Sequence, residues 1–65
     1  MIRENRLKNN LTQEQLAEKI DISWRHLQRL ENDEEHTTIN TLRKIIKTLN
    51  IPDDEILEYI KKDVS

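Results

Sequence analysis

The chain has 65 residues, a formal net charge of −2 at pH 7, and neither cysteine nor glycine. This length predicts one small domain over residues 1–65, and the lack of cysteine excludes disulfides and thiolate metal sites as a source of its stability. No apolar run approaches the ~20 residues of a transmembrane helix, and the N-terminus lacks a signal-peptide pattern, so we expect a soluble cytoplasmic protein.

Strand signals are missing, and the aromatic residues are one tryptophan and one tyrosine. An all-α fold with an aliphatic core is therefore predicted. A first helix is expected over about 2–9 and a second over about 12–20. For the second helix, Thr12 is a good N-cap, Gln15 completes a capping box, and Leu16 begins an apolar stripe.

A third helix is predicted over about 23–32, with Ser23 as its N-cap. Only two residues separate it from the second helix, which forces a sharp corner. Its leucines turn inward and leave an outer face that carries arginines and an amide. A short helix held out in this way is typical of proteins that read the major groove of DNA. The candidate base-reading residues are Trp24, Arg25, Gln28 and Arg29.

The second half of the chain has the strongest helical periodicity. Apolar residues recur at three- and four-residue steps after Thr38, which predicts a fourth helix over about 38–49. Pro52 suits the first turn of a fifth helix over about 52–62. Three acidic residues follow Pro52, at the positive end of the helix dipole.

A chain without glycine needs another residue type where the backbone turns left-handed, and Asn and Asp tolerate this conformation next best. Asn10 and Asn50 stand where the first and fourth helices should end, and Asp21 occupies the corner. Residues 32–33, Asn and Asp, follow the third helix. We interpret all of these as polar substitutes for glycine, and the alternative is that they are ordinary loop residues.

Five fragments of the chain, in their order and spacing, resemble the lambda-repressor-like, Cro-type (XRE-type) helix-turn-helix family. The resemblance runs over nearly the whole chain. It implies a compact five-helix DNA-binding domain in which the second and third helices form the helix-turn-helix. The fragments are LTQEQLAEKI (11–20), IS (22–23), LEN (30–32), TLRKI (41–45) and LNIPDDEIL (49–57).

The resemblance also implies roles for individual residues. Gln13 would contact a phosphate and brace the reading helix, and Ser23 would cap that helix and contact phosphate. Arg6 and Glu31 stand at the positions of an ion pair that members of the family often bury beneath the reading helix.

Two further phosphate contacts are predicted on the fourth helix. Asn40 lies near its N-terminus, where backbone N–H groups favour an anion, and Arg43 adds a positive charge. Catalysis finds no support in the sequence, and His26 and His36 do not stand at metal-ligand spacing with other ligands. We therefore predict no enzymatic activity, metal, cofactor or small-molecule ligand.

The sequence departs from the family pattern at three places. The corner holds Asp21 instead of the usual glycine, and residues 33–36 are acidic where family members often have basic residues. Trp24 is large for a first reading position. We expect it to be largely exposed and to contact a thymine methyl, a sugar or a partner protein, and the alternative folds it back on the second helix.

The predicted function is sequence-specific binding of double-stranded DNA by a transcriptional regulator. We expect a nucleoid-associated repressor of prokaryotic or phage origin that acts as a homodimer on an inverted repeat, with half-sites one helical turn (~34 Å) apart. The fifth helix is the predicted dimer surface, because it has more apolar residues than one small core contact needs. These residues are Ile56, Leu57, Tyr59 and Ile60.

Two alternatives remain open. The same fold can serve as a protein-interaction module, an antitoxin-like or anti-repressor partner with weak or no DNA binding, and the acidic residues 33–35 and the negative net charge favour it. The chain can also be the reading domain of a longer regulator that carries a sensor.

Overall fold

The structure, a computed structural model, describes residues 1–61, and within that range it contains helices and no strands. This confirms the all-α prediction. A short 3₁₀ turn, which the sequence did not predict, interrupts the five α-helices. The elements are α1 (Ile2–Lys8), α2 (Gln13–Lys19), α3 (Trp24–Asn32), η1 (Glu34–His36), α4 (Ile39–Leu49) and α5 (Asp53–Lys61).

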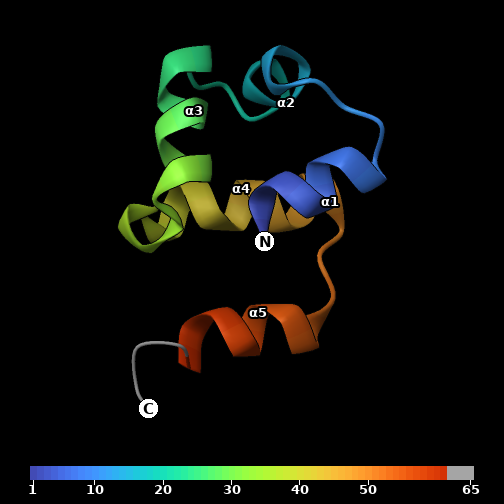
Figure 1. Cartoon of the computed structure of the whole chain (residues 1–65), viewed down its shortest axis with the longest axis vertical. Helices are drawn as coiled ribbons and strands as arrows, with labels where there is room; N and C mark the ends of the chain where they lie inside the picture. The colour runs from blue at the N-terminus through green and yellow to red at the C-terminus, as the bar shows by residue number, and fades with distance from the viewer. Residues whose placement is uncertain (62–65) are drawn as a thin grey trace.

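The helices are stacked along the long axis of a molecule of 33 × 20 × 18 Å (Figure 1). At one end lie α2 and α3, joined by a sharp corner. Helices α1 and α4 contact each other across the middle, and α5 lies at the other end. None of the helices within residues 1–61 is long and apolar enough to cross a membrane.

The observed bounds differ from the predicted ones by one residue at most, and the predicted end at Lys62 lies outside the described residues. The agreement follows from local hydrogen bonds at the helix starts. The Thr12 hydroxyl accepts a hydrogen bond from the Gln15 N–H (3.1 Å), and the Gln15 side chain accepts one from the Thr12 N–H (2.9 Å). The predicted capping box is therefore present.

Three non-glycine residues adopt left-handed backbone conformations: Asn10 and Asp21 at φ 58° and Asn50 at φ 54°. The prediction that they substitute for glycine is confirmed. It was wrong for residues 32–33, because Asn32 still belongs to α3 and Asp33 has φ −145°. The chain leaves α3 through this extended residue and enters η1 directly, so no left-handed residue is needed there.

The hydrophobic core is aliphatic and draws its buried residues from the first four helices and their loops. Those residues are Ile2, Leu16, Ala17, Ile20, Leu27, Leu30, Ile45, Leu49 and Ile51. Both α2 and α3 are anchored in this core, which holds the helix-turn-helix rigidly. Helix α5 has no fully buried residue, and only Ile56 packs against the core from that helix.

Polar contacts complete the attachment of α5. The buried Asn5 side chain donates a hydrogen bond to Glu55 (2.7 Å), and the Tyr59 hydroxyl donates one to the Glu34 carbonyl. Of the four residues predicted to form a dimer surface, two therefore contact the rest of the chain and two are exposed. Ile56 and Tyr59 face the chain itself, because α5 must use part of its apolar side to stay attached.

Candidate nucleic-acid interface

Helix α3 presents a clear division between an inner and an outer face. The Ser23 hydroxyl accepts a hydrogen bond from the His26 N–H (3.0 Å) and starts the helix, and Leu27 and Leu30 point into the core. Arg25 and Arg29 are exposed on the opposite side, one helical turn apart. Gln28, also a predicted base-reading residue, is half-buried.

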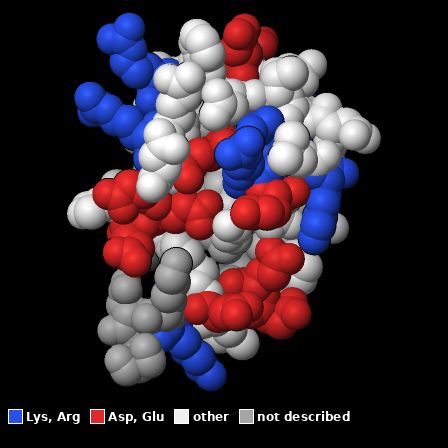
Figure 2. Space-filling view, in the orientation of Figure 1, with Lys and Arg blue, Asp and Glu red and all other residues white. Residues whose placement is uncertain are grey.

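The two arginines of α3 have no partner within the described part of the chain: neither enters an ion pair or a side-chain hydrogen bond. Figure 2 shows basic side chains projecting from the end of the molecule where α3 lies, while acidic side chains gather over η1 and α5. The guanidinium groups are therefore available to an acceptor outside the protein.

A buried ion pair fixes α3 from behind. The Arg6 guanidinium donates to both carboxylate oxygens of Glu31, with Nε–Oε2 at 2.8 Å and Nη2–Oε1 at 3.2 Å, and Nη1 donates to the Leu11 carbonyl (2.8 Å). The Arg6 and Glu31 side chains are only 9% and 4% exposed. The pair that the resemblance implied is thus present, and it ties α3 to α1 and to the loop before α2. Removing one partner of such a pair strands a buried charge and costs about 3–5 kcal/mol.

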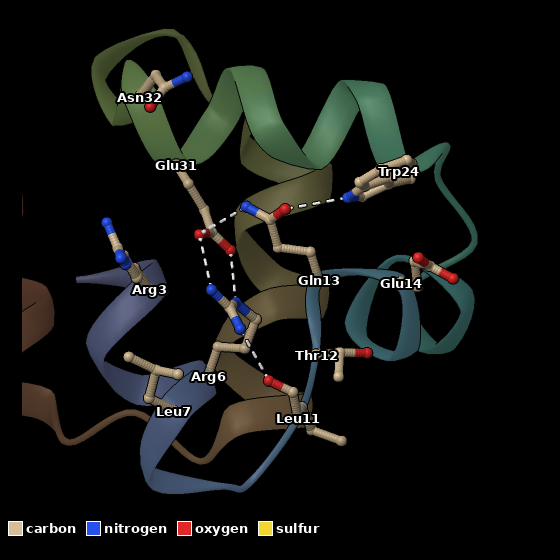
Figure 3. Close-up of a pocket in the computed structure, with 10 residues that line it drawn as sticks. All are labelled: Arg3, Arg6, Leu7, Leu11, Thr12, Gln13, Glu14, Trp24, Glu31 and Asn32. Atoms are coloured by element: carbon tan, nitrogen blue, oxygen red, sulfur yellow. Dashed lines mark hydrogen bonds and ion pairs between the residues drawn. The ribbon is translucent and has the colours of Figure 1, made fainter.

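Gln13 extends this network to the N-terminal end of α3 (Figure 3). Its amide nitrogen donates to Glu31 Oε1 (3.2 Å), and its amide oxygen accepts from the Trp24 indole N–H (3.0 Å). Both ends of the amide are therefore engaged within the protein. Trp24 contacts Gln13, the first residue of α2, and remains 50% exposed. Its position therefore combines the two predictions, an exposed ring and a ring folded back on the second helix.

The comparison with protein families accords with this geometry. A family model described as Helix-turn-helix matches residues 2–56. The chain belongs to this helix-turn-helix family. The family is the XRE type, similar to lambda repressor and Cro, and its members are typically non-enzymatic. The protein is thus a DNA-binding helix-turn-helix regulator with the lambda-repressor-like fold. The searches of curated proteins and of solved structures gave no significant match.

The other residues predicted to contact DNA phosphates lie near helix starts. Asn40 and Arg43 are exposed in the first half of α4, and neither side chain has a partner among residues 1–61. Ser23 is exposed, but its hydroxyl oxygen already accepts the capping hydrogen bond of α3. Gln13 contacts both Glu31 and Trp24 of α3, and the second N–H of its amide nitrogen has no acceptor among the described residues and is free to donate to a phosphate.

Two of the three acidic side chains after α3 have internal partners. Glu34 accepts hydrogen bonds from the Met1 ammonium group (3.1 Å) and from the Ile2 N–H (2.6 Å). Asp33 contacts the His36 ring at 2.6 Å. Within residues 33–35, only the Glu35 carboxylate is exposed and without a partner. No sequence pattern indicates the Glu34 contacts, because Glu34 and its partners are more than 30 residues apart.

The ammonium group of Met1 responds electrostatically to these contacts. Burial on its own lowers the pKa of this group, but hydrogen bonds to Glu4 and Glu34 outweigh burial and raise the pKa above its usual value. The group therefore stays charged at neutral pH and offsets the charge of Glu34. No cluster of three His, Asp or Glu side chains in the described range could hold a metal ion.

Proposed function

We propose that this protein is a transcriptional repressor that binds a specific inverted repeat in double-stranded DNA as a homodimer. The observation that carries the proposal is the pair of unpartnered guanidinium groups, Arg25 and Arg29, on the outer face of a helix braced by the buried Arg6–Glu31 pair. A rigid helix with outward arginines suits recognition of base edges in the major groove.

Each residue of α3 is assigned a role by its chemistry. Arg25 and Arg29 each donate two hydrogen bonds to the O6 and N7 atoms of a guanine, and Gln28 makes a bidentate hydrogen bond with an adenine. Trp24 contacts a thymine methyl or a sugar through its ring, because its N–H is engaged with Gln13. Contacts to phosphates come from the flanking helix starts: Gln13, Ser23, Asn40 and Arg43.

A homodimer follows from the small number of contacts that one domain can make. Two copies double the base contacts, and their α3 helices would enter successive turns of the major groove, ~34 Å apart. On α5, Leu57 and Ile60 are 53% and 55% exposed and offer an apolar surface to a second copy. Occupation of the site in the cytoplasm, where the DNA lies, would exclude other proteins from it, which is repression.

The decisive test is selection of bound sites from a random DNA pool, followed by affinity measurements on the selected site and on a random duplex. Arg29→Ala should weaken binding to the selected site by ~1–3 kcal/mol and to the random duplex very little, because it removes a base contact. Arg43→Ala is the matched control and should weaken both equally. Equal losses for Arg29→Ala on both duplexes would make Arg29 a phosphate contact.

A second candidate function is a protein-interaction module, antitoxin-like or anti-repressor, on the same fold. The net charge of −2 and the acidic side chains over η1 and α5 favour it (Figure 2). The dependence of DNA affinity on salt distinguishes the two functions. A DNA-binding repressor loses affinity steeply as salt rises, whereas an interaction module shows almost no slope.

A further inference from the structure

An open hollow of about 570 Å³ lies between α1, the start of α2 and α3 (Figure 3). Its floor is the hydrogen-bonded network of Arg6, Glu31 and Gln13, and Trp24 stands at one side. The floor has no net charge, because the Arg6 guanidinium and the Glu31 carboxylate bind each other. Any charge that the hollow presents to a ligand must therefore come from its rim.

Arg3 supplies a positive charge on that rim. Its side chain is exposed, and it makes no ion pair or hydrogen bond within the described residues. Figure 3 shows it extending from α1 toward the end of α3 that carries Asn32. The adjacent carboxylate, Glu4, is bound by the Met1 ammonium group at 2.8 Å instead. That hydrogen bond is the main reason why the pKa of Glu4 is lowered, and Arg3 contributes least.

The other rim residues decide which ligand suits the hollow. The exposed Asn32 amide adds a polar group at the end of α3, whereas the Glu14 carboxylate lies at the start of α2, away from Arg3. The Arg3 side therefore favours an anion. The hollow is also continuous with the reading helix, because Trp24 belongs to both. DNA presents a phosphodiester anion every few ångströms along each strand that borders the groove.

We infer that the DNA-binding surface extends from α3 across this hollow to α1, where Arg3 binds a backbone phosphate. The inference rests on the proposed DNA-binding function and adds to it a contact from a helix outside the helix-turn-helix. The contact also fixes the side of α3 along which one DNA strand runs.

The test compares Arg3→Ala with Lys8→Ala on the same helix. Both changes remove one exposed positive charge from α1, but Lys8 lies on the α5 side, 3.7 Å from Glu55. Affinity is measured on the selected site and on a random duplex over a range of salt concentrations. Arg3→Ala should weaken both complexes to the same degree and reduce the slope of log affinity against log salt by about 0.9, as loss of one phosphate contact requires. Lys8→Ala should keep the wild-type slope.

Arg3→Lys keeps the charge and should keep the slope, which separates a phosphate contact from a folding defect. Thermal melts of the three variants check that each is folded. A steep slope shared by the wild type and Arg3→Ala would overturn the role of Arg3 and leave DNA binding intact. A wild-type chain that binds no duplex, or binds with no salt dependence, would overturn the proposed function and this inference together.

Discussion

The hydrogen bond between Trp24 and Gln13 decides what each of these residues can offer to DNA. The indole N–H is the only donor of a tryptophan side chain, and here it is used within the protein. The Gln13 amide is held between Trp24 and Glu31, and Glu31 is held in turn by Arg6. The exposed end of α3 is thereby connected, through the side chains of Trp24 and Gln13, to the buried ion pair that orients the helix.

Trp24→Phe isolates the contribution of the indole N–H, because it keeps most of the ring. We expect weaker binding to the selected site with an unchanged preference at every base pair, since the Gln13 amide loses a partner that orients it. The loss of one exposed hydrogen bond should lower the free energy of unfolding by no more than about 1 kcal/mol. Fluorescence anisotropy with labelled duplexes measures the affinity, and a repeated selection measures the preference.

Two outcomes are informative beyond that expectation. A changed preference at one base pair would mean that the indole N–H leaves Gln13 and donates to a base in the complex. Trp24→Ala serves as the control that removes the ring as well. If it binds as Trp24→Phe does, the ring contributes nothing to DNA contact.

At the scale of elements, the angle between α2 and α3 depends on one backbone conformation. Asp21 occupies the corner with φ 58°, where family members usually have glycine. A side chain with a Cβ atom is strained there, and Asp is among the residues that tolerate the conformation best. The corner therefore works without glycine, at a small expense in stability.

Substitutions at Asp21 test this account. Asp21→Ala should lower the free energy of unfolding by about 1 kcal/mol, because alanine has no polar side chain to stabilise the left-handed backbone. Asp21→Gly should change it by less than about 0.5 kcal/mol, since relief of strain offsets the larger entropy of the unfolded chain. Urea denaturation measures both.

Glu18→Ala, on the exposed side of α2, is the control for loss of a negative charge. If Asp21→Ala and Asp21→Gly are equally stable, the Cβ atom does not strain the corner and another contact must set the angle.

At the scale of the whole molecule, α5 is the α-helix with the fewest contacts to the core. It is attached by Ile56, by Asn5 and by the Tyr59 hydroxyl, while Leu57 and Ile60 face outward. Acidic side chains gather over η1 and α5, whereas basic side chains project from the end of the molecule where α3 lies (Figure 2). A second copy that packs on α5 would leave both α3 helices accessible to DNA.

Ile60→Asp should therefore weaken dimerisation and binding to the selected site together, because it places a charge in an apolar interface. The folded monomer should be unaffected, since Ile60 is 55% exposed. Sedimentation at micromolar concentration measures the oligomeric state. Leu7→Asp on α1 matches it in exposure and should leave sedimentation unchanged. Dimers that persist in Ile60→Asp would exclude α5 as the interface.

The sequence by itself determined the helices, their starts and their left-handed ends. These features depend on residues within one or two turns of each other: apolar spacing, the cap at Thr12, and polar residues at Asn10, Asp21 and Asn50. The Arg6–Glu31 pair was also predicted, but only through the family resemblance, because nothing local relates residues 25 positions apart.

Tertiary structure alone decided how the polar side chains are paired. In the folded protein Glu34 accepts a hydrogen bond from the first N–H of α1, and the Tyr59 hydroxyl donates one to the Glu34 carbonyl. The Trp24 indole N–H donates to the Gln13 amide oxygen. Such contacts depend on the angles and distances at which helices pack, and these angles are set by the whole core. For the same reason no sequence pattern identifies Arg3 as a rim residue, because α1 lies beside α3 only in the folded protein.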